Sequence, residues 1–531
     1  MKDWLSRVLV VFFCAGVALF GVLSVHAATP DDTLVIGFNR ISNNLLPGAN
    51  SALPNIWANM LIYDSLVIHD SQGKVHPALA KSWEVSKDGL IWTFHLREDV
   101  KFHSGRKFTS KDVKASFDNW KTLPTAVKIA ALDRTEVVDD YTVRFVLKYP
   151  TLVFLTMISQ TEWSYSAIPD SEAVKKYGAD YGVLPESVSG TGPYKLTKWV
   201  RGDRMEFARN PEYKWGPAFY KNRGPARIEK VIIRSIEEDA SRSAALERHE
   251  IDMDISLSEK DAPRFAKMKG IKVMTKPKNT AHHLGFNFKK PLWNDERLRQ
   301  ALLMSYDQDV IVKVAYNGYA QKAVGLWAES VEGHTPKAEM AKLVPPYNPD
   351  KARQLLEEAG WKVGSDGIRF KDGKPLKFTC YIYTESMANL MTVVQQQWRE
   401  IGADVEVRMM EYAAWQKAVK EGEHDMRYVD STHSTADFAY WFTCAAIPYP
   451  NHMHYCDPTT DKYYEISQKT LVNSERVKAF QDMEKDFIKR AILLPMPHTM
   501  WIVAAWDNVK DLDLHPIHGY YKLMDVTKAG K

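Results

Sequence analysis

Cysteine is scarce in this sequence. The chain has 531 residues and only four cysteines, Cys14, Cys380, Cys444 and Cys456. So few cysteines exclude the small, disulfide-dense scaffolds of many secreted domains. Cys14 lies in an apolar N-terminal segment, so three cysteines belong to the rest of the chain. In an oxidising compartment, Cys444 and Cys456 can close a short loop and leave Cys380 as a buried thiol.

A metal site is the alternative use of the same region. The segment "NHMHYCD" places His452, His454, Cys456 and Asp457 close together. On a strand, the two histidines would share one face and begin a transition-metal site. A second pair, His282 and His283, is adjacent and therefore predicted to lie on opposite faces of a strand. The residues alone leave both uses of the 444–457 segment open.

The motifs of common hydrolases and nucleotide-binding enzymes are also missing. The sequence contains no G-x-S-x-G elbow, H-E-x-x-H helix, P-loop or dinucleotide fingerprint. The segment "SGTGPY" (189–194) has two glycines beside a proline, which alone predicts a turn. Carboxylate pairs such as Asp252 and Asp254 are too common to indicate catalysis by spacing. We therefore expect a protein that is not an enzyme, with a secreted hydrolase as a remote alternative.

Charge of one sign does not dominate. Lysine and arginine total 70 against 66 acidic residues, a formal net charge of +4 without a basic cluster, so we expect no nucleic-acid partner. At the N-terminus, Lys2 and Arg7 precede an apolar run over 8–25, and Val25 and Ala27 fit the positions that a signal peptidase reads. This pattern predicts a cleaved signal peptide over 1–27 and export to the periplasm. An uncleaved membrane anchor is the alternative, because about 20 apolar residues can span a bilayer.

The rest of the chain mixes strand and helix patterns without a repeat or a Pro/Gly/Ser-rich linker. Short β-branched or alternating runs predict strands at 33–39, 91–96, 141–148 and 230–236. Lys87-Asp88-Gly89 predicts a hairpin turn before 91–96. Helical spacing and terminal signals predict helices over 110–120, over 294–318, over 349–359 and after 387. Ser110 is the predicted cap of the first helix, and Gly402 and a strand follow the last. The fold class is α/β, or α+β with mixed sheets, whose domains are joined by strands that cross between them.

The segment "HPALAKSWEVSKDGLIWTFHLREDVKFHSGRKFTSKDVKASF" (76–117) contains much specific sequence and no apparent chemistry. It resembles the signature region of the family-5 extracellular solute-binding proteins, the peptide- and nickel-binding receptors of ABC importers. Three further segments, 190–216, 295–312 and 347–361, are similar to that family in the expected order. Within the family, "QQWREIGADVEV", "EGEHDM" and "FTCAAIPYPNHMHYCDP" most resemble dipeptide-binding members.

The resemblance implies a two-lobed periplasmic-binding-protein fold, type II and cluster C-like. Lobe I would comprise 28–282 with an inserted subdomain over about 46–185, lobe II 283–497, and a return to lobe I 498–531. The crossing strands would lie near 282–288 and 493–498. Dipeptide-binding members pair the two cysteines of the last quoted segment, which implies a disulfide between Cys444 and Cys456.

By the same resemblance, the protein captures a peptide or a similar amine-bearing small molecule between two closing lobes. It would then deliver this ligand to the permease subunits of an ABC transporter in the inner membrane. The resemblance implies a monomer with no cofactor and no metal. A metal-chelate, nickel or haem receptor of the same fold, using His433 or the His452/His454 loop, is the alternative.

The residues that grip a dipeptide in these relatives are not all retained. Relatives hold the ligand's amino group with an Asp three residues after a Trp, where this chain has Ser434 and Ser431. The Arg that binds the ligand carboxylate aligns near Tyr381, and a neighbouring tyrosine is retained as Tyr383. Replacement and lining residues are therefore expected elsewhere in the two lobes. The predicted ligand-binding residues are Tyr383, Asp430, His433, Asp437 and Trp441 from lobe II, and Asn50 and Tyr165 from lobe I.

Overall fold

The computed structural model describes residues 29–49, 53–159, 165–429, 439–517, 519 and 522–529. The predicted signal peptide lies outside these residues. Within them, no helix is both long enough and apolar enough to cross a membrane.

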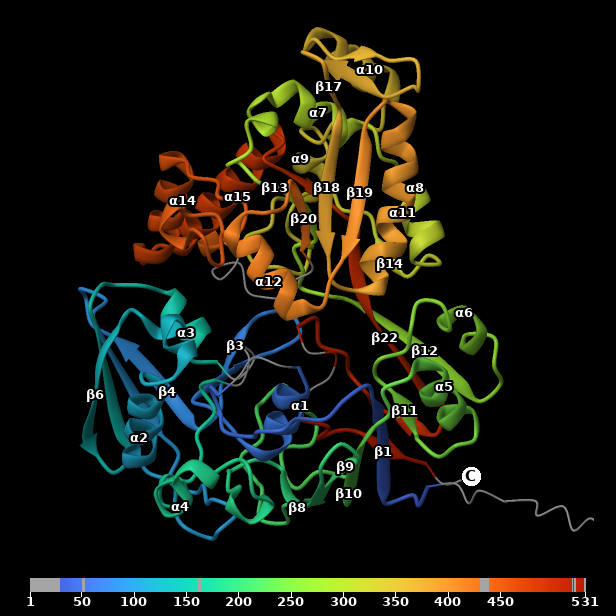
Figure 1. Cartoon of the computed structure of the whole chain (residues 1–531). Coiled ribbons are helices and arrows are strands. Elements are labelled where there is room, and N and C mark those ends of the chain that lie inside the picture. Colours follow the sequence, from blue (N-terminus) through green and yellow to red (C-terminus); the bar gives the residue numbers. More distant parts are fainter. Residues whose placement is uncertain are drawn as a thin grey trace, which may run out of the picture.

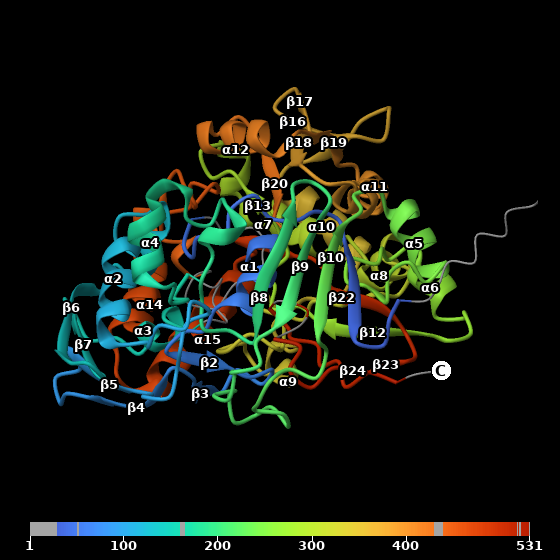
Figure 2. The same ribbon diagram turned by 90° about the horizontal axis from the view of Figure 1, so that it is seen from below.

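A mixed eight-stranded sheet dominates the lower part of Figure 1, and Figure 2 shows its strands side by side from below. Its order is β12-β22-β11-β1-β10-β9-β8, with β14 paired to β22. β1 runs parallel to β10 and β11, and the other pairs are antiparallel. Its strands are β1 Thr33–Phe38, β8 Tyr194–Val200, β9 Arg204–Arg209, β10 Lys230–Ser235, β11 Met253–Asp254, β12 Ile271–Pro277, β14 Ala320–Gln321 and β22 His498–Trp506.

A four-stranded antiparallel sheet, β4-β5-β7-β6, stands at the left edge of the same part (Figure 1). Its strands are β4 Ala80–Val85, β5 Ile91–Leu96, β6 Leu132–Asp139 and β7 Thr142–Leu147. Trp92, Phe94 and Leu96 on β5 are buried, as their alternation predicts, and the turn at Gly89 joins β4 to β5. Most of the signature segment therefore builds this sheet and the helix beside it.

The helix beside this sheet is α2 (Ser110–Trp120), and its N-cap lies one residue earlier than predicted. Thr109, not Ser110, is the N-cap, and it forms a capping box with Asp112. Ser110 is buried and its hydroxyl donates to the Asp139 carbonyl. The other helices of the lower part are α1 Leu53–Ile62, α3 Val153–Met157, α4 Ser171–Tyr177, α5 Asp239–Glu247 and α6 Ala262–Phe265.

The upper part of Figure 1 is built on a five-stranded mixed sheet in the order β19-β18-β20-β13-β21. β18 is parallel to β19 and β20, whereas β13 is antiparallel to β20 and β21. Its strands are β13 His283–Phe286, β18 Lys377–Ile382, β19 Asp404–Met409, β20 Met426–Val429 and β21 Leu493–Pro495. Its helices are α7 Glu296–Met304, α8 Gln308–Ala315, α9 Lys337–Met340, α10 Pro349–Glu358, α11 Glu385–Glu400, α12 Tyr412–Glu421, α14 Pro458–Lys469 and α15 Asn473–Lys489.

The single helix predicted over 294–318 is wrong. The chain forms α7 and α8, separated at residues 305–307. Asp307 lies between them and its carboxylate accepts hydrogen bonds from the backbone N–H groups of Asp309 and Val310. An aspartate at this position starts a new helix, because it satisfies donors that a continuous helix would bond internally.

Three small sheets complete the described structure. They contain β2 Val67–His69 with β3 Val75–Pro77, β15 Lys362–Val363 with β16 Arg369–Lys371 and β17 Lys374–Pro375, and β23 Val509–Lys510 with β24 Thr527–Lys528. The mixed sheets and intervening helices confirm the predicted fold class.

Candidate functional site

The chain passes directly from β12 to β13 at residues 278–282 and from β21 to β22 at residues 496–497, between the eight-stranded and five-stranded sheets. The short β14, between α8 and α9, also pairs with β22. The two passages are neighbours, since β12 pairs with β22 on one side and β13 with β21 on the other. Between them, the Met496 N–H donates to the His282 carbonyl at 2.9 Å. Two adjacent extended segments at this boundary can bend together, which is the geometry of a hinge.

Histidines line this boundary and are held neutral by burial. Burial lowers the pKa of His498 to about 3, and the neighbouring His282 lowers it further. Burial also places the pKa of His283 well below its usual value, with a further contribution from the positive charge of Arg427. As predicted, His282 and His283 face opposite sides of the sheet, because one contacts Tyr428 and the other Phe442.

A cavity of about 410 Å³ lies where the two parts meet. Its lining comes from segments far apart in the chain: 69–74, 329–334 and 515–517. The volume is within the range of small-molecule sites, roughly 300–1,000 Å³. We call it the junction cavity. The predicted ligand-binding residues that the structure describes, Tyr165, Tyr383 and Trp441, do not line it, and no motif in the sequence singled out its lining segments.

A cluster of aromatic side chains lies at the end of β18 and on α12, where the upper part faces the lower part (Figure 1). The Tyr383 ring is 5.0 Å from Tyr412 and 4.7 Å from Trp415, measured between centroids. Trp441 packs against the same group, which also includes Tyr381. The structure therefore brings two predicted residues, Tyr383 and Trp441, together in this aromatic cluster. Tyr412 and Trp415 were missed because their helical spacing is also typical of ordinary core packing.

The third predicted residue within the described structure lies elsewhere. Tyr165 is buried in the lower core, where its ring is 5.9 Å from that of Trp120. It borders a small cavity of about 40 Å³ that is separate from the junction cavity. Asn50, Asp430, His433 and Asp437 lie outside the described residues, so their roles stay predictions.

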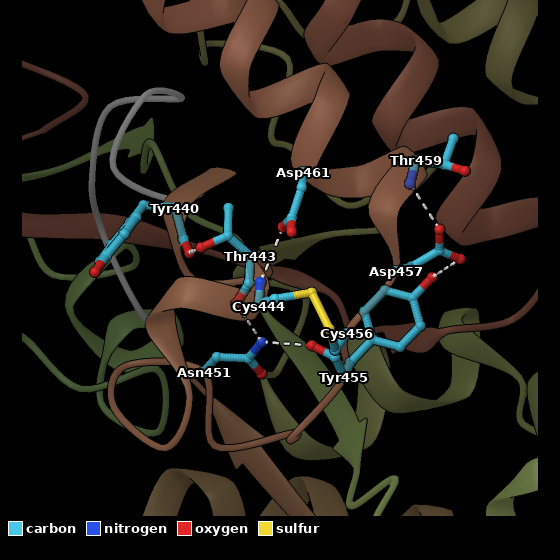
Figure 3. The surroundings of a disulfide bond; sticks show 9 residues. All are labelled: Tyr440, Thr443, Cys444, Asn451, Tyr455, Cys456, Asp457, Thr459 and Asp461. Atoms are coloured by element: carbon cyan, nitrogen blue, oxygen red, sulfur yellow. Dashed lines mark hydrogen bonds between the residues drawn. A yellow bond between two sulfur atoms is a disulfide. The ribbon is translucent and has the colours of Figure 1, made fainter.

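Cys444 and Cys456 form a disulfide, with their sulfur atoms 2.04 Å apart (Figure 3). Cys380 is a buried free thiol. Asn451 lies inside the closed loop and its amide nitrogen donates to the carbonyls of Thr443 and Tyr455, at 2.9 and 2.7 Å. The bond between Cys444 and Cys456 confirms the predicted disulfide.

The metal-site alternative for this loop is not supported. Residues 451–457 do not form a strand, so His452 and His454 do not share a strand face, and His454 has a positive φ of 51°. No cluster of three or more His, Cys, Asp or Glu side chains in the described part of the chain could hold a metal ion.

Comparisons with known proteins agree with this architecture. Residues 74–446 match the family described as bacterial extracellular solute-binding proteins, family 5 Middle. Di/tripeptide-binding protein 2 of Pseudomonas aeruginosa is 26% identical over 83% of this chain and 85% of its own length. The glutathione-binding protein of Salmonella typhimurium is 27% identical over 95% of this chain and 96% of its own. The crystal structure of NikA from Brucella suis in complex with Fe(III)-EDTA superimposes with a TM-score of 0.81 at 24% identity, covering 94% of this chain and all of that one.

Proposed function

The chain belongs to the bacterial extracellular solute-binding proteins of family 5. On that premise, we propose that it is the receptor of an ABC importer that captures a peptide or a similar amine-bearing small molecule. The observation that carries the proposal is the family match over residues 74–446, together with relatives named for binding di/tripeptides and glutathione. The ligand leaves chemically unaltered, since the sequence has none of the common catalytic motifs.

The mechanism we propose is closure of two lobes about the paired passages at 278–282 and 496–497. Lobe I is assigned to 28–282, with an inserted subdomain over about 46–185, lobe II to 283–497, and the return to 498–531. A ligand that touches both lobes stabilises the closed state through its differential affinity for that state. The aromatic cluster on lobe II supports a ligand site between the lobes, because aromatic side chains commonly line sites that enclose small ligands.

In the cell, we propose cleavage of the signal peptide after Ala27 and release of a monomer into the periplasm. The closed receptor would then dock on the permease subunits of its transporter. The N-terminal sequence pattern and the extracellular family support this location.

Thermal unfolding of the mature chain, residues 28–531, with a panel of dipeptides and tripeptides tests the proposal. A peptide at one hundred times its Kd should stabilise the protein by about 2.7 kcal/mol. The peptide recovered afterwards should have unchanged mass. Tyr383→Ala and Trp441→Ala should reduce the shift, whereas Tyr347→Ala, an exposed tyrosine outside the aromatic cluster, should not. No shift with any peptide, or hydrolysed peptide, would contradict the proposal.

A metal-chelate receptor is the second candidate, favoured by the structural likeness to NikA with Fe(III)-EDTA. Of the histidines predicted for it, His433 lies outside the described residues, and His452 and His454 do not share a strand face. Elemental analysis of the purified chain, before and after chelator treatment, separates the candidates. A stoichiometric metal that chelator removes would favour this second function over the first.

A further inference from the structure

Arg427 is a buried arginine that has no hydrogen-bond partner among the described residues. It lies in β20, within the five-stranded sheet, and its side chain is completely shielded from solvent. None of its three guanidinium nitrogens has a partner within the described residues. Burial lowers the pKa of Arg427 to about 9, so the side chain still carries its positive charge at neutral pH. An unpaired buried charge is strongly unfavourable, which makes this arginine an exception that requires a reason.

Other buried arginines of the chain show what a structural arginine looks like. In Arg299, the three nitrogens donate to the carbonyls of Ala491, Trp293 and Arg490. Arg369 and Arg242 likewise use every guanidinium nitrogen as a donor to carbonyl or carboxylate oxygens. Arg427 therefore differs from the fully bonded arginines that fasten this fold.

The guanidinium lies on the face of the sheet that α12 and the disulfide loop cover. Its register partners on the neighbouring strands are Tyr381 in β18 and Gly285 in β13. A Cβ atom at Gly285 would lie 3.6 Å from the guanidinium carbon and 2.9 Å from Met453. The absence of a side chain at Gly285 therefore leaves space for the guanidinium over the neighbouring strand, beneath the loop that carries Met453.

The surroundings of Arg427 supply neutral donors. Both ring nitrogens of the buried His452 lack a hydrogen-bond partner in the described part of the chain, and burial followed by the charge of Arg427 lowers the pKa of His452 to about 3. His424 is also buried, and its pKa is lowered for the same two reasons. Among the described residues, the groups whose charge interactions favour the charged arginine are Tyr383 and Cys380, and neither is a carboxylate.

We propose that Arg427, with the His452 imidazole beside it, forms a buried binding site for a carboxylate group. A carboxylate matches the donor fork of a guanidinium and would neutralise its charge. Two sources can supply that group: the C-terminus of a bound peptide, or a free small carboxylate.

The position of Arg427 connects it to the proposed ligand site, and the peptide source rests on the proposed function. β20 runs parallel to β18 and ends at Val429, two residues or about 7 Å beyond Arg427. Figure 1 shows β18 pointing toward the lower part, with α12 at that end. Arg427 also interacts electrostatically with Tyr383, a member of the aromatic cluster. Arg427 therefore lies behind the aromatic cluster, on the side of lobe II. There it is a candidate to bind the C-terminal carboxylate of a peptide.

Calorimetric titration of the mature chain and of Arg427→Met with alanyl-phenylalanine and with its C-terminal amide tests the peptide source. The parent should bind the free acid at least about thirtyfold more tightly than the amide, and Arg427→Met should bind both equally. A separate thermal-unfolding series with sodium acetate, against sodium chloride at equal ionic strength, tests the free source. Acetate should then stabilise the parent and leave Arg427→Met unchanged.

Folding of the variant is checked in the absence of ligand. Arg427→Met should be at least as stable as the parent, because an apolar side chain of similar size replaces an unpaired charge, whereas the matched Arg299→Met should be less stable. Equal binding of acid and amide by the parent, together with no acetate effect that depends on Arg427, would overturn the carboxylate site. Failure of the parent to bind either peptide counts against the proposed function. In that case the acetate series alone determines whether Arg427 binds a carboxylate.

Discussion

At the scale of single residues, a disulfide and two side-chain hydrogen bonds fix the loop that covers Arg427. The disulfide between Cys444 and Cys456 closes a loop of sequence separation 12, and Asn451 fills it with hydrogen bonds. The loop carries His452 and Met453, which lie over the sheet near Arg427. The covalent closure therefore holds the wall of the proposed carboxylate site.

Replacement of both cysteines, Cys444→Ala with Cys456→Ala, should reduce the free energy of unfolding by about 3 kcal/mol, because the unfolded chain gains loop entropy. Urea denaturation with and without reductant measures this effect. Reductant should destabilise the parent and leave the double variant unchanged, since Cys380 has no disulfide partner. A double variant as stable as the parent would show that the closed loop adds nothing.

Asp457 gives stability a defined pH dependence. Burial alone would raise its pKa, but hydrogen bonds from Arg490, from the Thr459 N–H and from Tyr455 hold it at about 2. The pKa is below its unfolded value of about 4, so the stabilisation is present above pH 4 and is lost as pH falls toward 2. Asp457→Asn should lower the free energy of unfolding by about 2 kcal/mol at pH 7, and by much less near pH 2.

Urea unfolding at several pH values, with Glu465→Gln as the control, measures this difference. Glu465 forms an exposed pair with Lys469, which should matter little at any pH. The same loss for Asp457→Asn at pH 7 and pH 2 would contradict the assignment.

At the scale of elements, the signature segment acts as a scaffold. Arg106 ties the segment to a later helix, because its guanidinium contacts both Asp112 in the first turn of α2 and Asp170, the N-cap of α4. Both carboxylates are buried. Arg106→Met should therefore reduce the free energy of unfolding by about 3 kcal/mol, since it leaves two buried negative charges without their cation.

Chemical denaturation measures the effect of Arg106→Met, and Arg134→Met on β6 of the same sheet is the control. Arg134 is exposed and pairs with Asp133 and Glu136, so its loss should change stability by less than about 1 kcal/mol. Equal effects of the two variants would remove the structural role assigned to the signature segment.

Periodicity in the sequence predicted the elements well where one face is buried. The alternation around Trp92 and Phe94 located β5, and Pro349 and Gly360 bracket α10 as expected. The break between α7 and α8 was missed because an aspartate inside an apolar repeat is normally a surface residue. The lack of a described hydrogen-bond partner for Arg427 depends on long-range packing beside Gly285, which no local pattern encodes.

At the scale of the whole molecule, two hydrogen-bonded passages connect the two large sheets. Closure about these passages should make the ligand-bound protein more compact. Small-angle scattering with a peptide found by the thermal panel should therefore give a smaller radius of gyration than the free protein. An unchanged radius of gyration at saturating peptide would contradict closure of the lobes without contradicting peptide binding.

The central claim is that this chain traps a small peptide and releases it intact. Native mass spectrometry of the mature chain, mixed with an equimolar set of dipeptides and tripeptides, tests that claim most directly. We expect a complex of one peptide per chain, from which gentle activation releases the peptide at its original mass. Spectra that contain only the free chain, or that show peptide fragments accumulating with time, would contradict it.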